Sequence, residues 1–284
     1  MGGYMTGKGN SGKLRQKLPT STVSPARIML CQATQRPIYR TGERVTTSWG
    51  WCKVTGRFGQ RHQDIMDAFM WNAEGSREVD DGKIELLVDP AKVRMTISDD
   101  GYSHGRLKTL INEIMQVTVE LKVTNGLWAI GGLLDHVKES PATKPNPLTR
   151  GERNLWRVRL GSAFVQLLKN DLPLHYDPRP IARLRYGISQ AISRHVLSHS
   201  LQPNGGWVLD GLIEAVAGKM SAGDQRNKRR DIRLDVQGLA GMGIVLDGER
   251  IYRHLPKACS TGLVRGGNSQ KRVAPARQRV APAQ

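Results

Sequence analysis

The segment "DQRNKRRDIRLDVQGLAG" (residues 224–241) holds the side chains best suited to bind an anion. On a helix of 3.6 residues per turn, one arc about 100° wide contains four arginines. They are Arg226, Arg229, Arg230 and Arg233; Gln237 continues this row, and Lys228 adds a further cation to the segment. Guanidinium groups form planar forks that fit phosphate oxygens and the edge of guanine. The segment therefore predicts a helix that contacts DNA, with Asp231 and Asp235 expected to point elsewhere.

The elements around this helix support that interpretation over a solvated charged face. Ile232, Val236, Leu239 and Ala240 cluster beside the arginine row and can pack on a preceding helix, "GLIEAVAG" (211–218), for which Asp210 is a possible cap. A turn at 219–223 separates the two helices. The hairpin "GIVLDGERIYRHL" (243–255) follows, with its turn at Asp247–Gly248. Helix, turn, helix and hairpin form the order of a winged helix, in which the basic helix has the recognition position.

The first half of the chain has a similar order. The stretches "RHQDIMDAFMW" (61–71) and "YSHGRLKTLINEIM" (102–115) have helical periodicity, and "GKIELLVD" (82–89) between them predicts a strand. A hairpin around Asn125–Gly126 follows in "QVTVELKVTNGLWAIGGLL" (116–134). The helix from Ser103 is the candidate for DNA contact here, through the side chains of Ser103, His104, Arg106 and Lys108. Because it has only two cations, opposed by Glu113, packing or dimerisation is an equally weighted alternative.

The second half begins after "KESPATKPNPLTRGER" (138–153), whose three prolines predict a loop or linker. Next come a strand, "LWRVRL" (155–160), helices within 162–171 and 180–199, and a short strand, "GGWVL" (205–209). The fold class predicted is α+β: two tandem winged-helix domains with disordered basic tails. The predicted parts are a tail at 1–30, winged helices at 31–140 and 141–258, and a tail at 259–284.

Composition points to an anionic partner. The chain has 284 residues and a net charge of +18. The first 27 and the last 24 residues each hold five cations and no acid, which leaves the middle about +8. A nucleic acid is the partner that this charge favours. There is no long apolar run and no apolar signal core, so we expect no membrane span and a cytoplasmic location. Cys31, Cys52 and Cys259 are too few and too scattered for a disulfide framework or a zinc site.

Motifs for catalysis or cofactors are weak. "GKGNSGKL" (7–14) is one residue short of a phosphate-binding loop, has Leu14 at the magnesium-ligand position, and lacks the flanking strand and helix. His195 and His199 lie four apart on a predicted helix, but no third metal ligand is near, so surface histidines are expected. We see no Ser-His-Asp arrangement and no rolling-circle motif. The sequence predicts a binding protein, not an enzyme, without metal or cofactor.

The stretches "LIEAVAGKM" and "QRNKRRDIRLDVQGLAGMG", with their closing hairpin, resemble the C-terminal winged helix of plasmid replication initiators, in particular the RepA and RepC initiators of broad-host-range plasmids. "TGRFGQRHQDIMDAFMW" and "GYSHGRLKTLINEIMQVTVEL" resemble the first winged helix of the same group. The resemblance covers about residues 40–256. It assigns the recognition role to Arg226, Lys228, Arg229, Arg230 and Arg233, and the corresponding first-domain role to the helix from Ser103.

The resemblance implies a plasmid-encoded bacterial protein that binds repeated origin sites (iterons), promotes melting of adjacent DNA and recruits host replication proteins. It also implies a dimer in solution and a monomer on DNA; the apolar hairpin at 127–134, including Leu133, is the expected dimer surface. The alternatives are a winged-helix transcriptional repressor and a basic RNA-binding protein. The latter lacks interleaved aromatic residues, since aromatics form only 5% of the chain. A nuclease would need a cluster of acidic metal ligands, which the sequence does not show.

Overall fold

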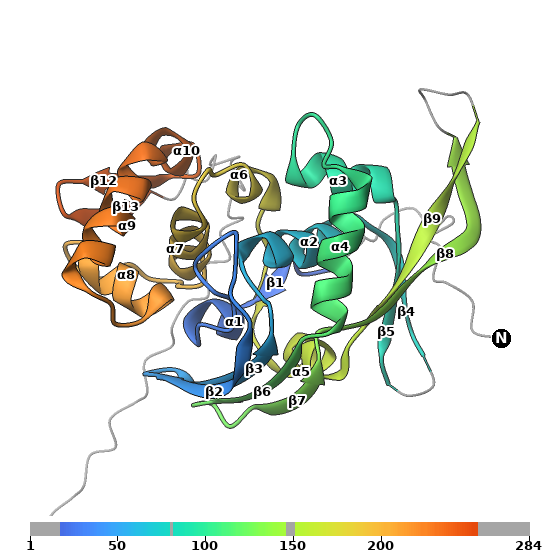
Figure 1. Cartoon of the computed structure of the whole chain (residues 1–284), viewed down its shortest axis with the longest axis horizontal. Coiled ribbons are helices and arrows are strands. Elements are labelled where there is room, and N and C mark those ends of the chain that lie inside the picture. The colour runs from blue at the N-terminus through green and yellow to red at the C-terminus, as the bar shows by residue number, and fades with distance from the viewer. Residues whose placement is uncertain (1–17, 80–81, 146–150, 255–284) are drawn as a thin grey trace, which may run out of the picture. The chain divides into compact units, whose positions relative to one another are not determined.

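The computed structural model describes residues 18–79, 82–145 and 151–254, which form a mixed α+β structure with several small antiparallel sheets (Figure 1). The helices are α1 (Val23–Arg27), α2 (Gln60–Trp71), α3 (Pro90–Ile97), α4 (His104–Met115), α5 (Ser162–Asn170), α6 (Pro178–Ala182), α7 (Gly187–Leu197), α8 (Leu209–Ala217), α9 (Ala222–Leu234) and α10 (Val236–Ala240). One four-stranded sheet has the strand order β2 (Arg40–Thr47), β3 (Gly50–Gly56), β6 (Thr118–Val123) and β7 (Trp128–Gly132). The other has the order β4 (Ala73–Glu78), β5 (Ile84–Val88), β9 (Glu152–Leu160) and β8 (Leu134–Pro145). Smaller sheets join β11 (Trp207–Val208), β13 (Arg250–Arg253) and β12 (Ile244–Asp247), and β1 (Ser21–Thr22) with β10 (Pro173–Leu174).

Two hydrophobic cores organise these elements, and the division between them differs from the predicted domain boundary. The first core takes its buried residues from Ile28 to Leu167, and the second from Leu184 to Ile251 together with Ala33. Strand β9 therefore belongs to the first core, through Trp156, Val158 and Leu160, and not to a second domain beginning at residue 141.

The proline-rich stretch at 138–153 is not a linker, because most of it lies in β8 and β9, which pair with each other. Strand β8 is at the edge of its sheet, where proline is tolerated because one side of the strand needs no ladder hydrogen bonds. Its register with β9 shifts between Glu139 and Thr143, around Pro141. The prolines alone predict a loop here, but at the edge of a sheet they are compatible with a strand.

Residues 18–30 also differ from expectation, since they are not a disordered tail. Strand β1 pairs with β10, and Thr20 Oγ1 donates a hydrogen bond of 2.8 Å to the carbonyl oxygen of Tyr176. The Ser24 backbone N–H donates to Asp171 Oδ2 at 2.7 Å, and Ile28 enters the first core. Thr20, Ser21, Thr22 and Ser24 are all buried, which ties this segment to the folded part of the chain. The rest of the predicted tails, the phosphate-loop-like residues 7–14 and Cys259 lie outside the described residues.

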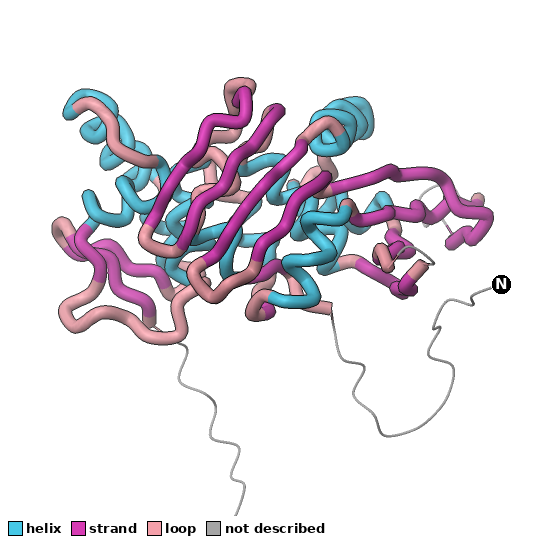
Figure 2. Tube along the Cα trace, turned by 90° about the horizontal axis from the view of Figure 1, so that it is seen from below, coloured by secondary structure: helices cyan, strands magenta, loops and turns pink. Residues whose placement is uncertain are grey.

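The first core buries one face of the sheet β2-β3-β6-β7. Alternate residues such as Cys52, Val54 and Leu121 enter the core with helices α2 and α4, which form where helical periodicity predicted them. The predicted hairpin is confirmed by the β6–β7 pairing, and Gly126 adopts a φ of 93° in its turn. The sequence did not reveal β2, β3, β4 or α3. No helix of the described residues lies over the opposite face of this sheet in Figure 2.

In the second core, one buried carboxylate explains two breaks that the sequence did not predict. The Asp235 side chain accepts hydrogen bonds from the backbone N–H groups of Arg185 (3.0 Å) and Tyr186 (2.9 Å). Those residues separate α6 from α7, where one helix was expected over 180–199. Asp235 itself ends α9, so the expected helix over 224–241 becomes α9 and α10. The hairpin β12–β13, with Gly248 in its turn, forms as predicted.

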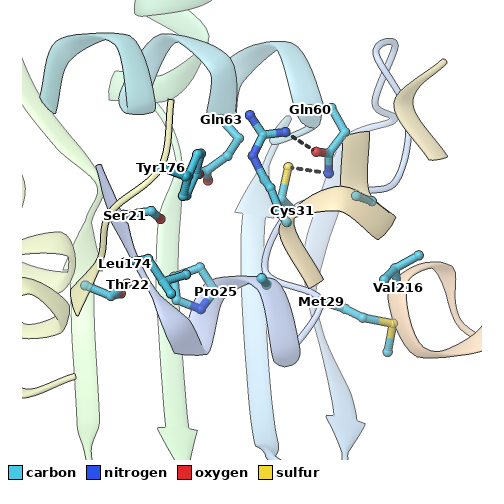
Figure 3. A pocket seen from close by; sticks show the side chains of 13 residues that line it. Ser21, Thr22, Pro25, Met29, Cys31, Gln60, Gln63, Leu174, Tyr176 and Val216 are labelled. Atoms are coloured by element: carbon cyan, nitrogen blue, oxygen red, sulfur yellow. Dashed lines mark hydrogen bonds between the residues drawn. The ribbon is translucent and has the colours of Figure 1, made fainter. Parts of the chain in front are cut away.

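A buried polar cluster joins the two cores. Arg194 of α7 pairs with Asp64 (2.7 Å) and Asp67 (2.9 Å) of α2, and with Gln60 Oε1 at 2.6 Å. The Tyr176 hydroxyl donates to Asp67 at 2.7 Å. Burial disfavours the Arg194 cation, but the two carboxylates outweigh this and raise its pKa well above the usual value. Figure 3 shows Gln60 and Tyr176 beside a cavity of about 20 Å³, which suits a water molecule and no organic ligand.

Cys31 and Cys52 are buried free thiols, and burial raises the pKa of Cys52 to about 11. Among the described residues, every helix is too short or too polar to cross a membrane.

Candidate nucleic-acid interface

Helix α9 is fixed at its ends and along one narrow stripe. Ser221 caps its start, with Oγ accepting a hydrogen bond of 3.1 Å from the Asp224 backbone N–H. Ile232 is the helix's one buried residue among its thirteen and lies in the second core. Asp235 holds the other end through its two bonds to the α6–α7 connection. Most of the surface of α9 therefore remains available to a partner.

The exposed stripe of α9 carries arginines at intervals of one and two turns. Arg226, Arg230 and Arg233 are all exposed, with 67% of the Arg230 side chain and 51% of the Arg233 side chain accessible. Lys228 and Arg229 are half-buried. Asp231 does not point away from the row as expected, because its Oδ1 lies 3.3 Å from Arg230. Arg226 pairs with none of the described carboxylates, which leaves its guanidinium free to bind an anion.

Two acids whose pairing the sequence did not predict fix the remaining arginines. Arg229 makes a two-pronged ion pair with Asp210 of α8, in which Arg229 Nε donates to Oδ1 at 2.6 Å. This hydrogen bond lowers the pKa of Asp210. Asp210 is therefore a partner of α9 and not the predicted cap of α8, whose N-cap is Val208. Arg233 pairs at 2.5 Å with Glu249 of the β12–β13 turn.

The structure separates Gln237 from the predicted row. Gln237 is exposed but belongs to α10, beyond the break at Asp235. The expected anchors Ile232 and Leu239 are buried, Val236 is half-buried and Ala240 is exposed. In the β12–β13 hairpin, Arg250 Nη1 donates a hydrogen bond of 2.8 Å to the Gly205 carbonyl oxygen.

The candidate residues of α4 are accessible. Ser103, His104, Arg106 and Lys108 are all exposed, although Ser103 occupies the N-cap position without a side-chain capping bond. Glu113 does not oppose the two cations as expected. It accepts a bond of 2.7 Å from Nε2 of buried His62, whose Nδ1 accepts from the Gly59 backbone N–H. Burial lowers the pKa of His62, which favours this neutral tautomer despite the nearby Glu113.

His195 and His199 are not both surface residues as expected. His195 is 5% exposed and its Nδ1 lies 3.2 Å from the Ala26 carbonyl oxygen, while His199 is half-buried. Burial lowers the pKa of His195 to about 4. Over residues 18–79, 82–145 and 151–254, no three His, Cys, Asp or Glu side chains are grouped to hold a metal ion.

The residues that sequence reasoning missed lack a local signal. Asp210 and Glu249 lie 19 and 16 residues from the arginines they pair with. Comparison with protein-family models, with curated proteins and with solved structures finds no match for this chain.

Proposed function

We propose that this protein is a sequence-specific binder of double-stranded DNA that initiates plasmid replication at repeated origin sites. In this proposal the chain has two winged helices, the second formed by α8, the turn, α9 and the β12–β13 wing, the first by α2, α4 and the β6–β7 hairpin. The protein binds origin repeats, promotes melting and recruits host replication proteins, and it acts without catalysis of its own.

The observation that carries this proposal is the geometry of α9. A helix with a single buried residue and a stripe of exposed arginines can enter a major groove without disturbing the core. The ion pairs of Arg229 with Asp210 and of Arg233 with Glu249 hold two guanidinium groups in place. Arg226 and Arg230, which are less constrained, are the side chains proposed to contact bases or phosphates.

The test is replication of an otherwise origin-less plasmid that carries this gene and its flanking DNA. We expect the unmodified gene to sustain the plasmid and the double variant Arg226→Ala with Arg230→Ala to lose it. A matched variant, Arg57→Ala with Lys138→Ala, removes two exposed cations that lie outside the second core and should retain replication. If the protein binds duplex DNA but its unmodified gene sustains no plasmid, the protein is a repressor and the initiator proposal fails.

A further inference from the structure

The uncovered face of the sheet β2-β3-β6-β7 carries aromatic rings and cations in register. One row across the four strands consists of Thr46, Trp51, Lys122 and Trp128. The adjacent row consists of Arg44, Lys53, Glu120 and Ile130. Neighbouring strands are about 4.8 Å apart, so the two tryptophans stand about 10 Å apart with Lys122 between them.

This face exposes large apolar side chains that a structural role alone would bury. Trp128 is 54% exposed and Ile130 is 51% exposed, while Ala129 between them lies in the core. Figure 2 shows the four strands with no described helix in front of them. Although aromatics are only 5% of the chain, three of its six tryptophans lie in this sheet or in its β2–β3 turn. Exposed apolar groups gathered in this way mark an interaction surface.

The charges of the face favour an anionic partner. The Arg44 guanidinium lies 4.5 Å from the centroid of the Trp51 ring, and Lys53 Nζ lies 5.5 Å from it. Within these two rows, Arg44, Lys53 and Lys122 outnumber the one acid, Glu120, which Lys53 contacts at 3.0 Å. A second copy of the same face would bring these cations toward one another, whereas a phosphate backbone would neutralise them.

We propose that this sheet face binds single-stranded DNA. Unpaired bases expose ring faces that can stack on Trp128 and on the Arg44 guanidinium held over Trp51. Lys122, between the rings, is placed for the intervening phosphate. A duplex does not fit this chemistry, because its bases are already stacked on one another. The choice of DNA over RNA rests on the proposed function, in which the protein opens an origin.

A groove extends the face around the β2 edge. Its volume is about 550 Å³, and it is lined by Arg27, Arg44, Trp49, Lys219 and one acid, Glu214. The Arg27 guanidinium lies 4.3 Å from the centroid of the Trp49 ring, which repeats the pairing of Arg44 with Trp51. Lys219 belongs to the turn before α9. A strand leaving a duplex at α9 would thus meet rings and cations along its path to the sheet.

The experiment measures binding of the full chain to a labelled oligothymidylate about twelve nucleotides long. Trp128→Ala should weaken binding by about fivefold or more, and Trp128→Phe, which keeps a ring, should restore most of it. Lys122→Ala should make the log–log salt dependence shallower by about 0.7. Tyr39→Ala, which removes a ring of similar exposure (58%) before β2, should have little effect. Each variant is first checked for unchanged thermal unfolding.

Equal losses for Tyr39→Ala and Trp128→Ala, or no loss for Trp128→Ala, would overturn the proposal. Tighter binding of the matching oligouridylate would show that the ligand is RNA. A change of oligomeric state on light scattering, without a change in oligonucleotide binding, would make the face a contact between copies. A duplex arm separates this inference from the proposed function: Arg226→Ala with Arg230→Ala should lose duplex binding and keep oligothymidylate binding. A chain that binds oligothymidylate through Trp128 and shows no duplex preference would sink only the proposed function.

Discussion

Helices α4 and α9 are nearly equal in length, but they are held in opposite ways. Helix α4 buries Leu107, Leu110, Ile111 and Ile114, whereas α9 buries Ile232 alone. Helix α4 is thus part of the first core and carries two exposed cations. Helix α9 is a mostly exposed, charged helix that is held at its ends and by ion pairs to Asp210 and Glu249. Substitutions on the buried face of α4 should therefore change folding, while substitutions on the exposed stripe of α9 should change binding.

The largest expected effect comes from breaking the link between the two cores. Arg194→Met leaves the buried Asp67 without its cation and Asp64 with Arg61 alone, which should lower the free energy of unfolding by about 3–5 kcal/mol. Arg230→Met, at an exposed site in α9, should change it by less than about 0.5 kcal/mol. Urea denaturation of both variants measures this contrast. Similar midpoints for the two would show that the Arg194 cluster does not hold the cores together.

A second contrast sets leucines of α4 and α9 against each other. Leu110→Ala removes a side chain that is 2% exposed and should cost about 2–5 kcal/mol of stability. Leu234→Ala removes one that is 59% exposed and should cost less than about 0.5 kcal/mol. The same denaturation experiment measures both. Comparable losses would mean that α9 is anchored to the core by more than Ile232.

The third prediction concerns pH, because each core holds a buried histidine with a lowered pKa. The pKa of His195 falls from 6.5 to about 4 on folding, so the unfolded chain binds a proton first as the pH drops. Stability should therefore fall between pH 6.5 and 4, by about 3 kcal/mol from this group. His195→Asn should flatten the profile. His62→Gln should flatten it less, because Glu113 partly offsets the burial of His62. An unchanged profile for His195→Asn would remove His195 as the source.

Local patterns in the sequence predicted a large part of the fold. Helical periodicity located α2 and α4, and Asn125–Gly126 and Asp247–Gly248 marked two hairpins, because these signals depend only on neighbouring residues. The β8–β9 pair could not be predicted in this way, since its prolines are tolerated only at an edge that the sequence does not reveal.

The candidate site could likewise be predicted only in part from local sequence patterns. The arginines of α9 follow from helical spacing, but their partners Asp210 and Glu249 come from other elements. Asp235, whose carboxylate ends α9, acts through bonds to residues 49 and 50 positions away. The row that joins Trp51, Lys122 and Trp128 depends on strand register across three separate strands. Such long-range pairings carry no sequence periodicity.

The most direct measurement compares α9 with α4 on duplex DNA. The full chain is used to select its preferred duplex from a randomised pool, and the affinities of two charge-matched variants are then measured on that duplex. Arg229 is left intact, because its removal would also release Asp210. Arg226→Ala with Arg230→Ala should weaken binding by more than about tenfold and make the log–log salt slope shallower by about 2, with stability unchanged. Arg106→Ala with Lys108→Ala in α4 should have a clearly smaller effect; equal losses, or a larger loss for the α4 pair, would contradict the assignment of α9 as the main DNA-contacting helix.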